Sequence, residues 1–191
     1  MNITIYIINV LSGFAFSSDS YVENGKYPLY TIKNVQDSGV VSTVDNYIDV
    51  LPSNMPDYCL LKCGDILTSL TGNVGRIGVV YENNALLNQR VAKLSPKEQT
   101  LYPFVLFTMK SKLIRKRIET IAIGSSQANI SPLDIAALKI PFNKDIALLF
   151  SKNTQQIVYK YISNMRENAT LIKLRNFLLP MLMNGQAKID G

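Results

Sequence analysis

The chain has 191 residues, among them 20 Lys and Arg, 14 Asp and Glu and no histidine, and its formal net charge is +6. A hydrophobic content of 47% and a charged content of 18% are globular values, which excludes wholesale disorder. A chain of this length forms one domain with a sizeable core and at most one appendage. No apolar run is long enough to span a bilayer, so no membrane partner is expected.

The residue types offer little for catalysis. Without histidine, Ser-His and Cys-His arrangements are excluded. Neither a G-x-x-x-x-G-K-[ST] loop nor a G-x-G-x-x-G helix start is present, so no nucleotide-phosphate site is expected. Cys59 and Cys63 lack the further ligands that zinc needs, and we expect no metal site but two free thiols in a reducing cytoplasm. Isolated carboxylates such as Asp65 and Asp134 are interpreted as turn or cap residues.

Short strands and turns are predicted through the first 143 residues. The opening MNITIYIINVL lacks the charged lead of a signal peptide and is expected to be a strand. LYTIKNVQDSGVV alternates and then breaks at residues 37–39, as a β-hairpin does. TGNVG, residues 71–75, is interpreted as a hairpin turn in which Gly72 and Asn73 are able to adopt positive φ. With helical signals at residues 17–22 and at Ser131-Pro132, the mixture predicts an α+β domain.

A basic helix is predicted from Pro103 to Ile121, because apolar residues recur there at three- and four-residue spacing. The net charge is −4 over residues 1–75, +6 over residues 76–140 and +4 over residues 141–191, and much of the middle excess lies in MKSKLIRKRIE. This segment holds five candidates for contacts with nucleic-acid phosphates: Lys110, Lys112, Arg115, Lys116 and Arg117. A solvated helix face and the docking of a partner subunit are the alternative interpretations.

One long helix is predicted from Asp145 to about Asn184, where Asn184-Gly185 ends it. A helix of about 35 residues is about 50 Å long and too apolar on one side to stand alone. It either folds back on its own domain or pairs with another helix as a coiled coil, with Asn168 and Arg175 fixing the register. The helix-pairing candidates at heptad spacing are Val158, Tyr161, Met165, Ile172, Leu179 and Leu182.

Several stretches, in this order and spacing, carry a family resemblance across nearly the whole chain: SGFAFSSDSYVENGKYPLYTIKNVQDSGV, LLKCGDILTSLTGNVGRIGVV, LLNQRVAKLSP, IGSSQANISPLDIAALKIP and LRNFLLPMLMNGQAKI. The chain resembles the DNA-specificity subunit of type I restriction-modification systems. The resemblance implies a target-recognition domain over residues 1–143, with a mixed or antiparallel sheet, and a long coiled-coil helix with a short tail over residues 144–191. Family members hold two such halves whose helices pack antiparallel, so this chain is expected to be a half-length form. Three interpretations of the half length are open. The chain is a half-length subunit that pairs with itself as a homodimer, a truncated gene product, or one half of a subunit.

The resemblance also implies a function and its partners. Such a subunit is not an enzyme: it reads one half of a split double-stranded DNA target and docks methyltransferase (modification) subunits and a restriction/translocase subunit. S-adenosylmethionine, ATP and Mg²⁺ are expected on those partner subunits, and no cofactor is expected on this chain. The alternative is a truncated assembly protein that acts through its coiled coil without specific DNA binding. An enzyme that modifies nucleic acid by itself is disfavoured by the lack of histidine and of nucleotide motifs.

Polar residues in the loops that carry the resemblance are the candidates for base contacts. Gln and Asn bond adenine bidentately in the major groove and Arg bonds guanine. For each residue the alternative is an ordinary exposed loop side chain. The candidates are Lys33, Asn34, Gln36, Asn73, Arg76, Asn88, Gln89, Arg90, Ser125, Ser126, Gln127 and Asn129.

Overall fold

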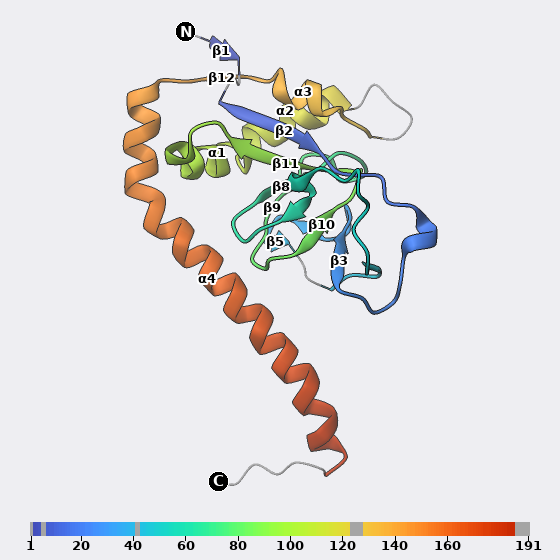
Figure 1. The fold of residues 1–191 in the computed structure, drawn as a ribbon. Helices are drawn as coiled ribbons and strands as arrows, with labels where there is room; N and C mark the ends of the chain where they lie inside the picture. The colour runs from blue at the N-terminus through green and yellow to red at the C-terminus, as the bar shows by residue number, and fades with distance from the viewer. Residues whose placement is uncertain (1, 5–6, 41–42, 123–127, 186–191) are drawn as a thin grey trace.

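The computed structural model describes residues 2–4, 7–40, 43–122 and 128–185. Short strands form a body, here the described residues before 144, and one long helix runs along one side of it and projects beyond it (Figure 1). The α+β fold class with a long C-terminal helix is confirmed. Within the described ranges, no helix is both long and apolar enough to cross a bilayer.

The first sheet has the strand order β2-β11-β8-β9 and is antiparallel throughout. Its strands are β2 (Ile8–Ser12), β11 (Val91–Pro96), β8 (Ile66–Ser69) and β9 (Ile77–Val79). All residues of β8 and β9 are buried, including the polar Thr68 and Ser69.

The second sheet has the order β6-β3-β10-β7 and is mixed, because β10 runs parallel to β3 and antiparallel to β7. Its strands are β6 (Tyr47–Ile48), β3 (Tyr27–Tyr30), β10 (Ala85–Leu87) and β7 (Leu60–Leu61). The strands are short, and the sheet buries a separate apolar cluster around Leu29, Ile48 and Leu86.

Two strand pairs and three short 3₁₀ helices complete the body. β1 (Asn2–Thr4) pairs with β12 (Lys139–Pro141), so the opening stretch forms two strands instead of the single expected one. β4 (Val35–Gln36) pairs with β5 (Gly39–Val40), which confirms the hairpin at residues 37–39. The 3₁₀ helices are Ser18–Ser20, Asp57–Cys59 and Gln99–Leu101.

The predicted helix from 103 to 121 is divided into α1 (Tyr102–Met109) and α2 (Lys112–Ala122). The prediction of one continuous helix was therefore wrong, and Ser111 explains the break between α1 and α2. Its hydroxyl accepts a hydrogen bond from the Ile114 N–H at 3.3 Å, which satisfies a donor in the first turn of α2.

Both later helices begin at the caps that the sequence indicates. Ser131 and Asp134 form a reciprocal capping box at the start of α3 (Pro132–Ala136), as expected from Ser131-Pro132. Asn143 accepts a hydrogen bond from the Ile146 N–H at the start of α4 (Lys144–Met183). Gly185 takes φ 66° directly after the helix, where glycine carries no Cβ penalty.

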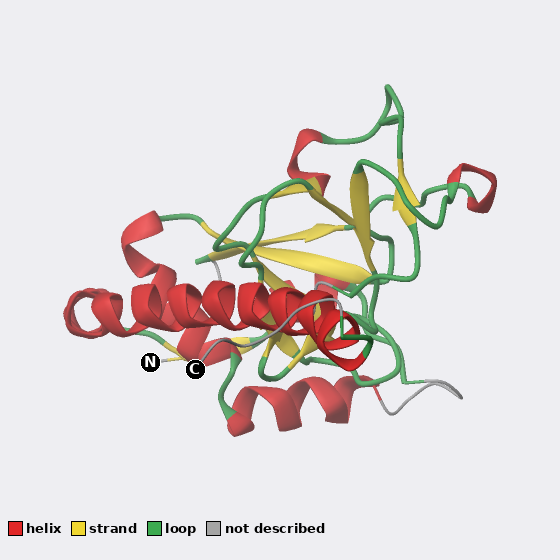
Figure 2. Ribbon diagram, turned by 90° about the horizontal axis from the view of Figure 1, so that it is seen from below, coloured by secondary structure: helices red, strands yellow, loops and turns green. Residues whose placement is uncertain are grey.

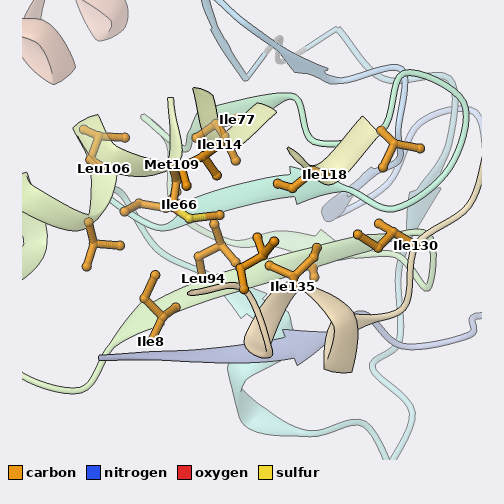
Figure 3. Close-up of a cluster of buried hydrophobic side chains, with 14 of the residues drawn as sticks. Ile8, Ile66, Ile77, Leu94, Leu106, Met109, Ile114, Ile118, Ile130 and Ile135 are labelled. Carbon is orange, nitrogen blue, oxygen red and sulfur yellow. The ribbon is translucent and has the colours of Figure 1, made fainter. Parts of the chain in front are cut away.

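Helices α1, α2 and α3 cover the first sheet and form the main core with it. Figure 3 shows Met109 of α1, Ile114 and Ile118 of α2 and Ile135 of α3 pointing toward Ile66 and Leu94 of the sheet. Because residues from α1 to α3 share one apolar cluster with this sheet, the basic helix α2 is held firmly against the body.

Only part of α4 packs on the body. Val158 is 4% exposed, the Tyr161 hydroxyl donates to the Ser38 carbonyl at 2.9 Å, and a Cβ at Gly39 would collide with Met165. Ion-pair contact continues to Lys173, whose ammonium lies 2.8 Å from Glu82. Figure 2 shows α4 as one continuous helix running past the strands. Three helix-pairing candidates, Val158, Tyr161 and Met165, therefore face their own body, whereas Ile172 and Leu179 are about half exposed.

Candidate nucleic-acid interface

Four loop segments from distant parts of the chain meet at one end of the first sheet. The Thr71 backbone bridges Asn129, and the Gly72 N–H donates to the Ala128 carbonyl at 3.1 Å. The Leu70 N–H donates to the Arg90 carbonyl at 3.0 Å, which joins the turn at residues 88–90 to the same place. The hairpin at residues 36–39 is the fourth segment. We call the side chains Gln36, Asn73, Arg76, Gln89, Arg90 and Asn129 the polar loop cluster.

Arg76 links two of these segments. Its Nη1 donates to the Gln36 Oε1 at 3.0 Å across 40 residues of sequence. The Asn73 amide lies beside the same guanidinium, and with its oxygen turned inward it accepts from Nη1 and Nη2 at 3.3 and 3.2 Å. Among the described residues the buried Arg76 Nε has no hydrogen-bond partner. A guanidinium carries five N–H donors. The two amide contacts therefore orient the Arg76 guanidinium and leave some of its N–H groups without a hydrogen-bond partner in the described part of the chain.

Glycine backbone geometry shapes the turn that carries Asn73 and Arg76. Gly72 has φ 71°, as expected from the sequence, whereas Asn73 does not adopt positive φ and Gly75 does, with φ 75°. A Cβ on Gly75 would lie 2.9 Å from the Ile118 Cγ2 of α2. The turn therefore packs closely on the basic helix.

Arg115 ties the start of α2 to the hairpin at residues 36–39. Its guanidinium lies 2.7 Å from Asp37 and 3.0 Å from Glu119. Hydrogen bonds to Asp37 and then to Glu119 raise the pKa of Arg115. Lys110 also reaches this hairpin, because its ammonium donates to the Asp37 carbonyl at 2.8 Å. Arg115 and Lys110 are thus engaged within the body.

The remaining cations of α2 differ in their surroundings. Arg117 donates to the Lys139 carbonyl at 2.6 Å. Lys112 and Lys116 are exposed, and among the described residues their ammonium groups form no hydrogen bond or ion pair. Both lie on the same side of α2 as Arg115, which is the side attached to the hairpin. Lys112 and Lys116 are therefore the cations of this segment best placed to meet an external phosphate.

Other predicted site residues lie elsewhere or serve the fold. Lys33 pairs with Asp45 at 2.8 Å on the open surface, and this hydrogen bond raises its pKa. Asn34 is 4% exposed, and its amide accepts from Thr31 and donates to the Thr43 carbonyl, so it supports the loop and does not face solvent. Asn88 is half-buried in the turn before Gln89 and its side chain accepts from the Gln89 N–H. Ser125, Ser126 and Gln127 lie outside the described residues.

A cleft of about 830 Å³ between α4 and the body was not predicted. Its floor holds an ion pair of 2.8 Å between Lys93 and Asp65, whose side chains are 14% and 16% exposed. Asp65 also accepts from the Lys62 N–H, which agrees with its interpretation as a turn residue. No pattern in the sequence predicts this cleft, because the residues that line it come from segments that are separated by dozens of residues.

Neither thiol forms part of a metal site in the part of the chain that the structure describes. Cys59 and Cys63 are free, and burial raises the pKa of the Cys59 thiol. The described residues contain no group of three or more Cys, Asp and Glu side chains suited to hold a metal ion. The arrangement places polar side chains and exposed cations on elements that share one core.

A protein family described as the type I restriction modification DNA specificity domain matches residues 7–177. The chain belongs to this specificity family. The type I restriction enzyme HindI specificity subunit from Haemophilus influenzae is 25% identical over 149 residues, which are 77% of this chain and 32% of that subunit.

Solved structures of specificity subunits share the fold of this specificity domain. The S subunit of the type I restriction-modification system from M. genitalium matches with TM-score 0.60 and 22% identity over 93% of this chain and 43% of its own. The HsdS subunit from Thermoanaerobacter tengcongensis matches with TM-score 0.57 and 16% identity over 95% of this chain and 44% of its own. The chain thus spans from 32% to 44% of the length of these relatives.

Proposed function

We propose that this specificity domain is a non-catalytic DNA-binding unit that reads one half of a split double-stranded target. The observation that carries the proposal is the meeting of four loop segments at one end of the first sheet, where Gln36 and Asn73 hold the Arg76 guanidinium. Residues that reach base edges must be oriented before they bind, and an Arg fork held by two amides meets that need. Family membership and the shared fold support the same function.

DNA binding uses two kinds of contact, one to base edges and one to phosphates. The polar loop cluster enters the major groove, where amide and guanidinium groups distinguish base pairs. Lys112 and Lys116, on the side of α2 next to the hairpin, contact phosphates and set the register of the domain on the duplex. Because α2 shares a core with the first sheet, the two sets of contacts keep a fixed geometry.

Catalysis belongs to other chains in this proposal. Modification subunits carrying S-adenosylmethionine and a restriction/translocase subunit with ATP and Mg²⁺ bind to the specificity domain and act at the site it selects. The second half of the target is read by another recognition domain held through α4, and a second copy of this chain is one source of it.

Replacing Arg76 tests the reading function. We expect Arg76→Ala to weaken binding to a duplex selected from a random library by about 1–3 kcal/mol, while binding to unrelated duplexes stays unchanged. Arg76→Lys should not restore binding, since an ammonium lacks the planar fork. Lys62→Ala, which removes one positive charge from the rim of the cleft beside α4, is the matched control. If the wild-type chain selects no sequence, it binds DNA without reading it and the assembly function is favoured.

A further inference from the structure

The hairpin at residues 36–39 carries Gln36, one of the two amides that hold the Arg76 guanidinium. An apolar cluster holds the base of this hairpin, whereas Asp37 and Ser38 at its tip are exposed. The strands β4 and β5 are two residues long and supply few ladder bonds, so they do not fix the tip by themselves. The place of the tip, and with it that of Gln36, depends on contacts from other elements.

Three helices hold the tip of the hairpin by polar contacts. Lys110, at the end of α1, donates to the Asp37 carbonyl at 2.8 Å. Arg115 of α2 lies 2.7 Å from the Asp37 carboxylate. Tyr161 of α4 donates to the Ser38 carbonyl at 2.9 Å. Both carbonyls of the tip are thus bound by side chains that come from outside the hairpin.

Lys110 and Tyr161 also contact each other, so the two carbonyl contacts form one unit. The Lys110 ammonium donates to the Tyr161 hydroxyl at 3.3 Å and lies 5.2 Å from the centre of the Tyr161 ring. One turn further along α4, Met165 occupies the space beside Gly39 that a Cβ would need. The helix α4 therefore lies directly against the turn that carries Gln36.

These polar contacts determine the position of the tip more than the stability of the fold. Asp37 and Ser38 are exposed, so water would bind their carbonyls if the protein side chains were removed. Exchanging a hydrogen bond to water for one within the protein changes the free energy of unfolding little. The direction is lost, however, because a water molecule follows the carbonyl wherever the turn moves.

We propose that Lys110 and Tyr161 are positioning residues for base recognition, which hold the hairpin tip and, through Gln36, the Arg76 guanidinium in the orientation that reads the target. The inference rests on the proposed function, because it assigns a role to the surroundings of the same Arg76. It follows that α4 contributes to base selection through Tyr161 without contacting a base.

The first test follows the Arg76 guanidinium without DNA. Tyr161→Phe removes one hydroxyl and keeps the ring, and it should shift the NMR signals of the Gln36 side-chain amide and the Arg76 Nε–H in isotope-labelled protein. Tyr159→Phe is the matched control, because Tyr159 also lies on α4 and its hydroxyl accepts from Gln155 at 3.2 Å. It should leave both signals in place. Unchanged signals in Tyr161→Phe would overturn the inference and leave the proposed function standing.

The second test measures selection at one base pair, the one at which Arg76→Ala relaxes it. Tyr161→Phe should reduce discrimination there by about fivefold, while the equilibrium constant of unfolding changes by less than about tenfold. In the Arg76→Ala background Tyr161→Phe should have no further effect on selection, because it acts through Arg76. A loss spread over all base pairs, or one that persists in that background, would indicate a general structural role and contradict the proposal.

Lys110→Met separates positioning from phosphate contact, since methionine keeps an apolar stem and lacks the ammonium. Positioning predicts the same loss of discrimination with an unchanged slope of log K against log salt, because the ammonium is bound within the body. A slope smaller in magnitude by about 0.9 would return Lys110 to the phosphate contacts.

Failure of the inference and failure of the proposed function give different results. If the wild-type chain selects a sequence and Tyr161→Phe keeps full discrimination, the inference alone fails. If the wild-type chain selects no sequence, the proposed function fails and the inference fails with it.

Discussion

Gly75 is the residue at which the turn at residues 71–76 meets the basic helix α2. Its φ of 75° lies in the region that other residues adopt only with strain, and the Ile118 side chain fills the space where a Cβ would stand. Ile118 is fully buried in the main core. The position of Arg76, one residue later, therefore depends on a contact that only glycine permits.

Gly75→Ala is expected to lower the free energy of unfolding by about 2–4 kcal/mol, from backbone strain together with overpacking against Ile118. Gly64→Ala is the matched control, because Gly64 has φ 95° with nothing within 4 Å of the added Cβ. The control should lose only the strain of about 1–2 kcal/mol. Urea denaturation measures the free energy of unfolding of both variants. Equal losses would show that the Ile118 side chain moves aside without destabilising the fold.

At the scale of elements, α2 combines packing against the core with the proposed contacts to phosphates. Ile114, Ile118 and Ala122 are buried on one side of the helix, and Arg115 bonds to the hairpin. Lys112 and Lys116 remain exposed. The basic run in the sequence thus contains cations with different roles, and only their surroundings in the fold separate them.

Replacing Lys112 and Lys116 together with Ala should weaken binding to every duplex alike. The slope of log K against log salt should fall in magnitude by about 1.8, because each phosphate contact contributes about 0.9. Arg115 is kept, since its removal would also release Asp37. Lys62→Ala with Lys152→Ala, two cations at the cleft beside α4, removes the same charge as a control. An unchanged slope in the α2 variant would indicate that this side docks a partner subunit.

At the scale of the whole molecule, α4 changes its role along its length. The helix packs on the body as far as Met165, through Val158, Tyr161 and Met165, and the aromatic ring of Phe150 packs edge-on against Phe104 and Phe107. From Leu174 onward most of its apolar residues are exposed, namely Leu174, Phe177, Leu178, Leu179 and Met183. One helix therefore joins a folded domain to an exposed apolar surface.

Two aspartate substitutions should separate these roles. Val158→Asp buries an unpaired charge and should lower the free energy of unfolding by more than 3 kcal/mol. Leu178→Asp should leave that free energy within about 0.5 kcal/mol at concentrations where the chain is monomeric, yet abolish self-association. Urea denaturation and sedimentation together distinguish them. Equal destabilisation by both variants would contradict an extended distal helix.

Much of the fold was predictable from local signals. The hairpin at residues 37–39, the Ser131 cap and the long helix ending before Gly185 all follow from short-range chemistry, and the structure confirms them. The break between α1 and α2 was missed, because apolar spacing continues through it while a single Ser111 hydroxyl starts a new helix. The family resemblance was also carried by sequence, through motifs whose order persists along the chain.

Tertiary structure alone decided which polar residues act together and which part of α4 stays free. Gln36 and Arg76 are 40 residues apart and Asp37 and Arg115 are 78 apart, so no local pattern joins them. Asn34 and Gln36 look alike in sequence, but burial commits the Asn34 amide to the loop. Likewise the heptad spacing that runs from Val158 to Leu182 is the same whether the partner is the body or another helix. Sequence determines the elements and their faces, because these depend on neighbours within a turn or two, and packing determines what each face meets.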